Sequence, residues 1–136
     1  MSDNIFVDSN IFIYAHTNLD SQKQIKAQQL LTAEKIFIST QVVNEFINAC
    51  NKKFKKEWKE INRVGLEIIS YSNLQTISAA IIEKAIEVAA RYKYSYYDSL
   101  IIASALDCEC DILYSQDLQH QQKINKTLVI INPFKQ

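Results

Sequence analysis

The stretch Ile5-Phe6-Val7-Asp8 places an acidic residue directly after a short, wholly apolar run. Three similar runs follow along the chain: Ile36-Phe37-Ile38, Ile112-Leu113-Tyr114 and Leu128-Val129-Ile130-Ile131. Unbroken apolar runs of this length are typical of strands that are buried on both faces, as in a parallel sheet. The segment from Leu74 to Ile77 is a weaker candidate strand.

The segments between these runs carry helical patterns. Apolar residues recur at three- and four-residue spacing, as on one face of an amphipathic helix, in three segments: Ser21 to Glu34, Thr40 to Phe54 and Ser78 to Tyr92. The predicted apolar faces include Ile25 in the first helix and Ile82 and Ile86 in the third. Ser78 is suited to cap the N-terminus of the third helix, and Ser95 is suited to cap a fourth that runs to about residue 107.

The chain contains a single glycine, Gly65, and a single proline, Pro133. Because hairpin turns depend on such residues, the composition argues against an all-β design. Strands that alternate with helices predict a three-layer α/β/α sandwich with a mainly parallel central sheet and right-handed crossovers. With 136 residues, of which 48% are hydrophobic, the chain has material for one substantial core, so we expect residues 1–136 to form a single domain.

The charge balance and the cysteines indicate where the protein acts. Lysine plus arginine and aspartate plus glutamate number 15 each, so any contact with a polyanion must be local. The three cysteines have no spacing typical of a metal or redox motif, and unbridged thiols suit a reducing compartment. The N-terminus lacks a secretory pattern, and no apolar stretch is long enough to span a bilayer. We therefore expect a cytoplasmic protein without a membrane role.

Two acids gain significance from following predicted strands. Asp8 comes directly after the first strand, and Asp117 comes three positions after Tyr114. In a parallel α/β sheet, ligands bind beyond the carboxyl ends of the strands. The sequence therefore predicts that Asp8 and Asp117 lie in a functional site.

Glu45 and Asp98 lie instead on apolar faces of predicted helices, and Asp98 shares its face with Ile101 and Ile102. No lysine or arginine stands at helical spacing from Asp98, and Lys52 is too far along the helix to pair directly with Glu45. A carboxylate held against a core without a partner loses its charge. Two carboxylates about 4 Å apart repel by about 4 kcal/mol at an effective dielectric constant near 20. A divalent cation would solve both problems.

Oxygen ligands without paired histidine or cysteine favour Mg²⁺ or Mn²⁺ over Zn²⁺, and such a site suits phosphodiester hydrolysis. Three of the acids also have a simpler interpretation: Asp8 as a helix cap, Asp98 as a partner of a helix dipole and Asp117 as a turn residue. The alternative function is a non-catalytic α/β protein-interaction domain. An aspartyl-phosphate site fits poorly, because no second acid stands next to Asp8 and no lysine precedes Pro133.

Four motifs in order resemble the PIN domain, specifically the VapC-type toxin ribonucleases of toxin–antitoxin pairs. They are Val7-Asp8-Ser9-Asn10, Ser39-Thr40-Gln41-Val42-Val43-Asn44-Glu45-Phe46, Tyr97-Asp98-Ser99-Leu100-Ile101-Ile102-Ala103-Ser104-Ala105 and Tyr114-Ser115-Gln116-Asp117-Leu118. The ending Ile131-Asn132-Pro133-Phe134 is similar to a frequent ending of this family, so the resemblance extends from Phe6 to Phe134.

The resemblance implies a compact α/β/α sandwich that hydrolyses single-stranded RNA with Mg²⁺ or Mn²⁺. The family's acidic quartet matches four residues of this chain: Asp8, Glu45, Asp98 and Asp117. Three of these, Asp8, Asp98 and Asp117, are expected to bind the metal, and Glu45 to act through a water or to activate it. Asn10 and Ser115 match polar residues that orient a carboxylate or a water on the metal. The implied partners are an RNA substrate, a cognate small antitoxin protein and a second copy in a homodimer.

The loop after the last acid departs from the family pattern. Related proteins commonly have a glycine there, whereas this chain reads Leu118-Gln119-His120-Gln121-Gln122. The shape of this loop cannot be carried over from the family.

Other residues have two interpretations each. The lysines of 52–59 offer a surface for an RNA backbone or a solvated helix face. The tyrosines of 92–97 suit base stacking or packing and self-association. His16 and His120 are read as neutral structural histidines rather than proton carriers, and Trp58 as an anchor for its helix.

Overall fold

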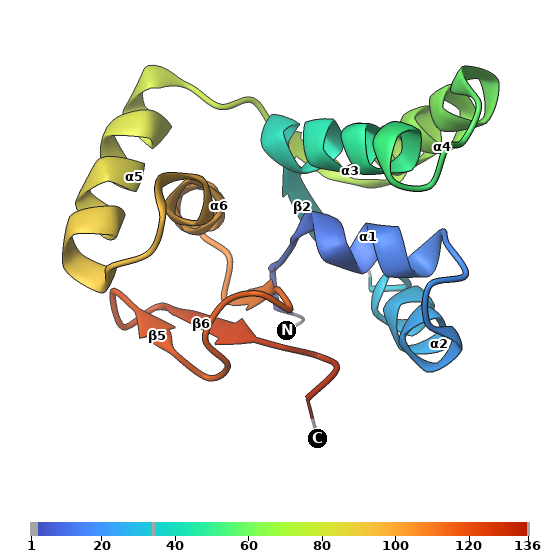
Figure 1. Cartoon of the computed structure of the whole chain (residues 1–136). Helices are drawn as coiled ribbons and strands as arrows, with labels where there is room; N and C mark the ends of the chain where they lie inside the picture. Colours follow the sequence, from blue (N-terminus) through green and yellow to red (C-terminus); the bar gives the residue numbers. More distant parts are fainter. Residues whose placement is uncertain (1–2, 34, 136) are drawn as a thin grey trace.

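The computed structural model describes residues 3–33 and 35–135 (Figure 1). Its helices are α1 (Ser9–Ala15), α2 (Ser21–Leu30), α3 (Thr40–Lys52), α4 (Trp58–Tyr71), α5 (Ala79–Tyr92) and α6 (Tyr96–Asp107). Its strands are β1 (Ile5–Val7), β2 (Ile36–Ser39), β3 (Asn73–Gln75), β4 (Ile112–Tyr114), β5 (Lys123–Ile124) and β6 (Leu128–Ile131). The four apolar runs of the sequence therefore form strands, and the weaker candidate forms β3 with its start at Asn73.

The strands form one sheet in the order β3-β2-β1-β4-β6-β5. Among the described residues every pair is parallel except β5 with β6. In the centre of the sheet, Ile5 of β1 stands opposite Ile36 on one side and Ile112 on the other. The first strand of the chain is therefore flanked by a strand more than a hundred residues further along.

The helices cover both faces of the sheet. The crossovers from β1 to β2 and from β2 to β3 carry α1 to α4, and the return from β3 to β4 carries α5 and α6. Right-handed crossovers that run in opposite directions across a sheet lie on opposite faces. Figure 1 agrees, with α5 and α6 on one side of the strands and α1 to α4 on the other. The expected three-layer α/β/α sandwich is confirmed, and its direction reverses between β1 and β4, where such sheets open a crevice.

The predicted caps form, and one predicted helix is shorter than expected. Ser78 Oγ accepts a hydrogen bond from the backbone N–H of Ile81, and Ser95 Oγ accepts one from that of Asp98. The helix predicted from residue 21 ends at Leu30, and its expected final residue, Glu34, lies outside the described residues.

The core lies between the sheet and the helices. Its largest fully buried side chains are Phe6, Phe12, Phe46, Ile11, Ile38, Ile68, Ile81, Ile102, Leu113, Ile124, Leu128 and Ile130. Three predicted apolar positions are instead exposed, Ile25 at 59%, Ile82 at 40% and Ile86 at 58%. The reason lies in the packing. Helix α2 buries only Ala27, and α5 packs on α6 while burying only part of its predicted apolar face.

Gly65 occupies the buried face of α4, in the middle of the helix. A Cβ atom at this position would meet no other atom within 4 Å. Because glycine in a helix interior is about 1 kcal/mol less favourable than alanine, Gly65→Ala is expected to raise the free energy of unfolding by about that amount. Urea denaturation at neutral pH measures the change. A less stable variant would mean that this face of α4 has no room for a Cβ atom at position 65.

Cys50, Cys108 and Cys110 are free thiols. Among the described residues, no helix combines the length and the apolar character needed to cross a bilayer.

Candidate active site

Asp8 lies at the reversal point of the sheet, directly after β1. The register that pairs Val7 with Tyr114 brings the next residues of both strands together. Ser115 Oγ accordingly donates a hydrogen bond of 2.8 Å to Asp8 Oδ2, across 107 positions of sequence. Asp8 Oδ1 accepts a second hydrogen bond, of 2.7 Å, from the backbone N–H of Ser9, so Asp8 also caps α1. The capping and site interpretations of Asp8 are therefore compatible.

Glu45 reaches the same place from the second turn of α3. Ser9 Oγ donates to Glu45 Oε1 at 3.0 Å and lies 3.5 Å from Asp8 Oδ1, so one hydroxyl joins the two acids. On its other side, Gln41 Nε2 donates to Glu45 Oε2 at 3.2 Å and to the backbone oxygen of Tyr97 at 3.1 Å. These contacts tie the start of α3 to the start of α6.

Asp117 is held from the opposite side, in the loop after β4. Asn10 Nδ2 donates to Asp117 Oδ2 at 3.3 Å, while Asn10 Oδ1 accepts from the backbone N–H of Gln116 at 3.4 Å. Ser115 Oγ also accepts from the backbone N–H of Asp117 at 3.4 Å. Asn10 is therefore hydrogen-bonded to Asp117, and Ser115 to both Asp8 and Asp117.

The electrostatics of this cluster are unfavourable without a cation. The pKa of Asp8 is raised from 3.8 to about 6: burial is the largest cause, the carboxylates of Glu45 and Asp117 also raise it, and hydrogen bonds from Ser115 and Ser9 lower it. Among the described residues, no lysine, arginine or histidine nitrogen lies within 4.0 Å of these three acids. Carboxylate oxygens without a protein cation form a donor set that suits a hard divalent ion such as Mg²⁺ or Mn²⁺.

Asp98 lies in the first turn of α6 and is half-buried. Its neighbour Tyr97 is joined through Gln41 to Glu45, which places the start of α6 beside the other acids. In the described part of the chain, no hydrogen bond joins the Asp98 side chain to Asp8, Glu45 or Asp117. The described residues likewise contain no group of three or more acidic, histidine or cysteine side chains arranged to bind a metal as they stand. The structure thus connects three of the four predicted acids.

The sequence analysis missed two residues of the site, Ser9 and Gln41. Ser9 joins two acids, and buried Gln41 joins Glu45 to the backbone of α6. A signal for Gln41 was present, because residues four positions apart on a helix are neighbours and Gln41 precedes Glu45 by four. Ser9 offered no comparable signal, since its role depends on how α1 approaches α3.

Neither histidine contacts the acids. His16 Nε2 is buried without a hydrogen-bond partner among the described residues, and burial lowers the pKa of this imidazole. His120 Nδ1 accepts a hydrogen bond of 3.0 Å from the backbone N–H of Asn132. The burial of His16 and the hydrogen bond to His120 both agree with structural roles.

The glycine-free loop after Asp117 takes a conformation that glycine favours. Gln121 has a left-handed φ of 69°, and its backbone N–H donates to the oxygen of Ile130. For a residue other than glycine, the left-handed backbone conformation is about 1 kcal/mol less favourable than the right-handed one. The chain therefore keeps a left-handed turn at this position without the residue that is best suited to it.

The tyrosines divide into two pairs. Tyr92 and Tyr94 are tied to the segment that contains β5, through hydrogen bonds with Asn125 and with Gln119 and Gln122. Tyr96 and Tyr97 are exposed and pack edge to face on each other, with ring centres 5.3 Å apart. Only the second pair is available at the surface beside Asp98.

Comparisons with known proteins identify this architecture. The sequence profile of the PIN domain matches residues 5–126. VapC20 of Mycobacterium tuberculosis, a sarcin-ricin loop cleaving toxin, is 19% identical with a TM-score of 0.70, over 84% of this chain and 90% of that chain. A toxin–antitoxin complex from Klebsiella pneumoniae is 20% identical with a TM-score of 0.72, over 97% and 99%. VapBC2 from Rickettsia felis, bound to a DNA fragment from its promoter, is 20% identical with a TM-score of 0.64, over 93% and 96%.

A search of curated proteins finds no match. The solved structures, at these low identities, bear on the fold. The profile match carries further, because it spans most of the chain and contains Asp8, Glu45, Asp98 and Asp117. The chain belongs to the PIN-domain family.

Proposed function

We propose that this protein is a metal-dependent endoribonuclease that hydrolyses phosphodiester bonds in single-stranded RNA, and that it is the toxin of a toxin–antitoxin pair. Membership of the PIN family supports the nuclease class, and the toxins among its structural neighbours support the biological setting. One observation carries the proposal: Asp8, Glu45 and Asp117 converge at the reversal point of the sheet and have no cation among the described residues.

The residues that would hold the metal are Asp8 and Asp117, with Asp98 completing the set from the start of α6. A bound Mg²⁺ or Mn²⁺ would polarise the scissile phosphate and stabilise the charge that develops on it. The protein's part is to keep the carboxylates oriented before the metal arrives. Ser115 and Ser9 hold both oxygens of Asp8, and Asn10 holds Asp117. Because the described acids are not arranged to bind a metal as they stand, they would have to close around the ion when it binds.

Glu45 is placed to handle the proton. Its carboxylate is joined to Asp8 through the Ser9 hydroxyl, and Gln41 holds its second oxygen. In the proposed reaction a water attacks the phosphorus and gives a proton to Glu45, while the bond from phosphorus to the leaving oxygen breaks and that oxygen takes up a proton from solvent.

The test is cleavage of an end-labelled single-stranded RNA by the purified protein. We expect cleavage with Mg²⁺ or Mn²⁺, none after the metal is chelated, and restoration when it is added back. A duplex of the same sequence serves as the control for single-strand preference. Cleavage that continues in EDTA would defeat the metal mechanism, and a protein that cuts no RNA would favour the non-catalytic interaction domain.

The proposed partners follow from the toxin assignment. A cognate small antitoxin would suppress the activity, and expression of the chain alone would arrest growth. A homodimer is proposed as well, since exposed Ile82 and Ile86 on α5 and Tyr97 on α6 offer apolar surface to a second copy. The free thiols suit a reducing cytoplasm.

A further inference from the structure

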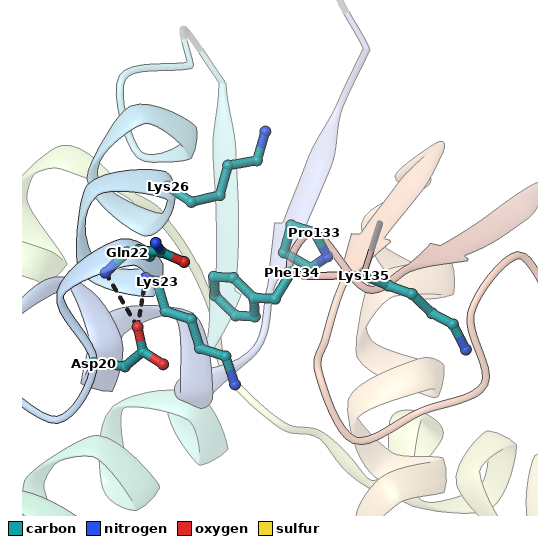
Figure 2. A pocket seen from close by; sticks show the side chains of 7 residues that line it. All are labelled: Asp20, Gln22, Lys23, Lys26, Pro133, Phe134 and Lys135. Carbon is teal, nitrogen blue, oxygen red and sulfur yellow. Dashed lines mark hydrogen bonds between the residues drawn. The ribbon is translucent and has the colours of Figure 1, made fainter.

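A lysine-lined pocket lies between α2 and the segment that follows β6. Its volume is about 400 Å³, and its lining residues are Asp20, Gln22, Lys23, Lys26, Pro133, Phe134 and Lys135. Figure 2 shows Lys23 beside the Phe134 ring, Lys26 further along α2, and Lys135 next to Phe134 in the C-terminal segment with its side chain extending away from the ring. The pocket thus gathers three positive charges from two segments that are distant in sequence.

Among the described residues these charges have no protein counter-ion. Within residues 3–33 and 35–135, no carboxylate lies within 4.0 Å of the ammonium group of Lys23, Lys26 or Lys135. The one acid that lines the pocket, Asp20, already accepts hydrogen bonds of 3.1 Å from the backbone N–H groups of Gln22 and Lys23 as the cap of α2. The pocket is therefore locally positive, although the chain as a whole has no net charge.

Aromatic rings fix part of the pocket. Tyr14 and Phe134 pack edge to face with ring centres 5.1 Å apart. Lys23 Nζ lies 4.8 Å from the centre of the Tyr14 ring and 5.4 Å from that of Phe134, and it donates to Tyr14 Oη at 3.4 Å. Cation–π contacts of this kind hold an ammonium group in place without neutralising its charge.

The same segments lead directly to the acidic cluster. Asn132, which begins the C-terminal segment, donates through Nδ2 to the backbone oxygen of Gln116 at 3.4 Å and accepts from the backbone N–H of Phe134 at 3.0 Å. Along α1, Tyr14 stands four residues after Asn10, on the same side of the helix, at a rise of about 6 Å. The residues that hold Asp117 and those that hold the pocket are thus one helical turn apart.

We propose that this pocket binds backbone phosphates of the single-stranded RNA next to the one that is cut; this inference rests on the proposed function. An acidic cluster repels a polyanion, and a chain without net charge supplies no general attraction, so substrate must be held by a local positive site. The lysine pocket has three lysines that form no ion pair with any residue of 3–33 and 35–135, and its C-terminal segment is hydrogen-bonded to the Asp117 loop. The rival run at 52–59 is less suitable, because Lys56 pairs with Glu60 and Glu57 stands within it.

The experiment measures RNA binding in EDTA, so that affinity is read without cleavage. A labelled single-stranded oligoribonucleotide is titrated by fluorescence anisotropy at several salt concentrations, with wild type and with the triple variant Lys23→Gln/Lys26→Gln/Lys135→Gln. We expect affinity to fall at least about tenfold, and the slope of log affinity against log salt to become shallower by about 2, as for the loss of three phosphate contacts. The double variant Lys26→Gln/Lys135→Gln, which keeps the packed Lys23, should show about two thirds of that change in slope.

Two comparison variants make the result specific. Lys93→Gln/Lys123→Gln/Lys126→Gln removes the same charge from exposed positions around the β5 edge and should bind as wild type does. Lys52→Gln/Lys53→Gln/Lys59→Gln tests the rival run. Wild-type affinity in the pocket variants, or an equal loss in either comparison variant, would overturn the proposal.

The outcomes also separate this proposal from the one it rests on. If wild type binds RNA through the pocket but does not cut it with Mg²⁺, the subsite stands and the nuclease proposal fails. If wild type cuts RNA and the triple variant does so with unchanged KM, the subsite fails and the nuclease proposal stands. If the lysine variants lose binding of a glutamate-rich peptide but keep binding of RNA, the pocket is instead a site for an acidic protein segment. Wild type that binds no RNA overturns both proposals.

Discussion

Asp8→Asn is expected to make the metal-free protein more stable while it abolishes RNA cleavage. The pKa of Asp8 is raised to about 6 by burial and by the neighbouring carboxylates. Each pKa unit corresponds to about 1.4 kcal/mol, so the ionised side chain costs up to about 3 kcal/mol near neutral pH. Asparagine keeps the shape of the side chain: its oxygen can still cap α1 at Ser9, and its amide can donate to Ser115 Oγ. Urea denaturation at pH 8 in EDTA measures the gain.

The gain should depend on pH in one direction only. Because the folded pKa of Asp8 is raised from 3.8 to about 6, the folded state binds a proton more tightly than the unfolded chain does. Wild type is therefore relatively most stable below pH 3.8, and this contribution is lost as the pH rises through about 6. The advantage of the asparagine variant should grow across that window and then level off. Equal differences in stability at pH 4 and pH 8 would contradict a buried, uncompensated carboxylate.

The same variant should lose the response to metal. A ligand that binds only the folded state stabilises it by about 2.7 kcal/mol at a hundred times its Kd, so Mg²⁺ or Mn²⁺ should raise the Tm of wild type. Without the Asp8 charge this rise should be largely lost. Cleavage should fall by about a thousandfold, which corresponds to the several kcal/mol that a catalytic metal contributes to the transition state. Retained activity would remove Asp8 from the proposed mechanism.

Asp98→Asn should lose cleavage to a similar extent but leave stability nearly unchanged. Asp98 is half-buried in the first turn of α6, and its carboxylate accepts no hydrogen bond from the described residues. Removing its charge forfeits the helix-dipole interaction, which is worth less than about 1 kcal/mol. Single-turnover cleavage and thermal unfolding, measured side by side, separate the two effects.

The matched control for Asp98→Asn is Asp107→Asn, the same substitution at the other end of α6. Asp107 is exposed and contacts Gln75, away from the acidic cluster, so cleavage should be unaffected. If both variants lose activity equally, the loss reflects the helix rather than the site. Full activity in Asp98→Asn would reduce the proposed metal ligands to the acids that the structure already connects.

The sequence predicted the layers and strands well because apolar runs and helical spacing are local signals. It was less successful where burial depends on a partner. Ile25 and Ile86 belong to apolar patterns yet remain exposed, because α2 and α5 are covered by fewer neighbours than their patterns allow. No local signal states how many elements will pack on a helix.

The candidate site follows the same division. Asp8 and Asp117 were predicted from their places after strands, since parallel strands end at a common edge. Their connection through Ser115 could not be predicted, because it depends on the register between β1 and β4. The bridge from Gln41 to the start of α6 depends in the same way on how two helices meet.

The central place of β1 has a consequence for protein synthesis. β1 leaves the ribosome well before β4, so its second edge stays unpaired until β4 has been made, and Ser115 reaches Asp8 only across 107 positions of chain. Contacts so distant in sequence form late in folding. During most of translation Asp8 therefore lacks the residues that complete its site. A nuclease of this design would stay inactive beside the ribosome that makes it.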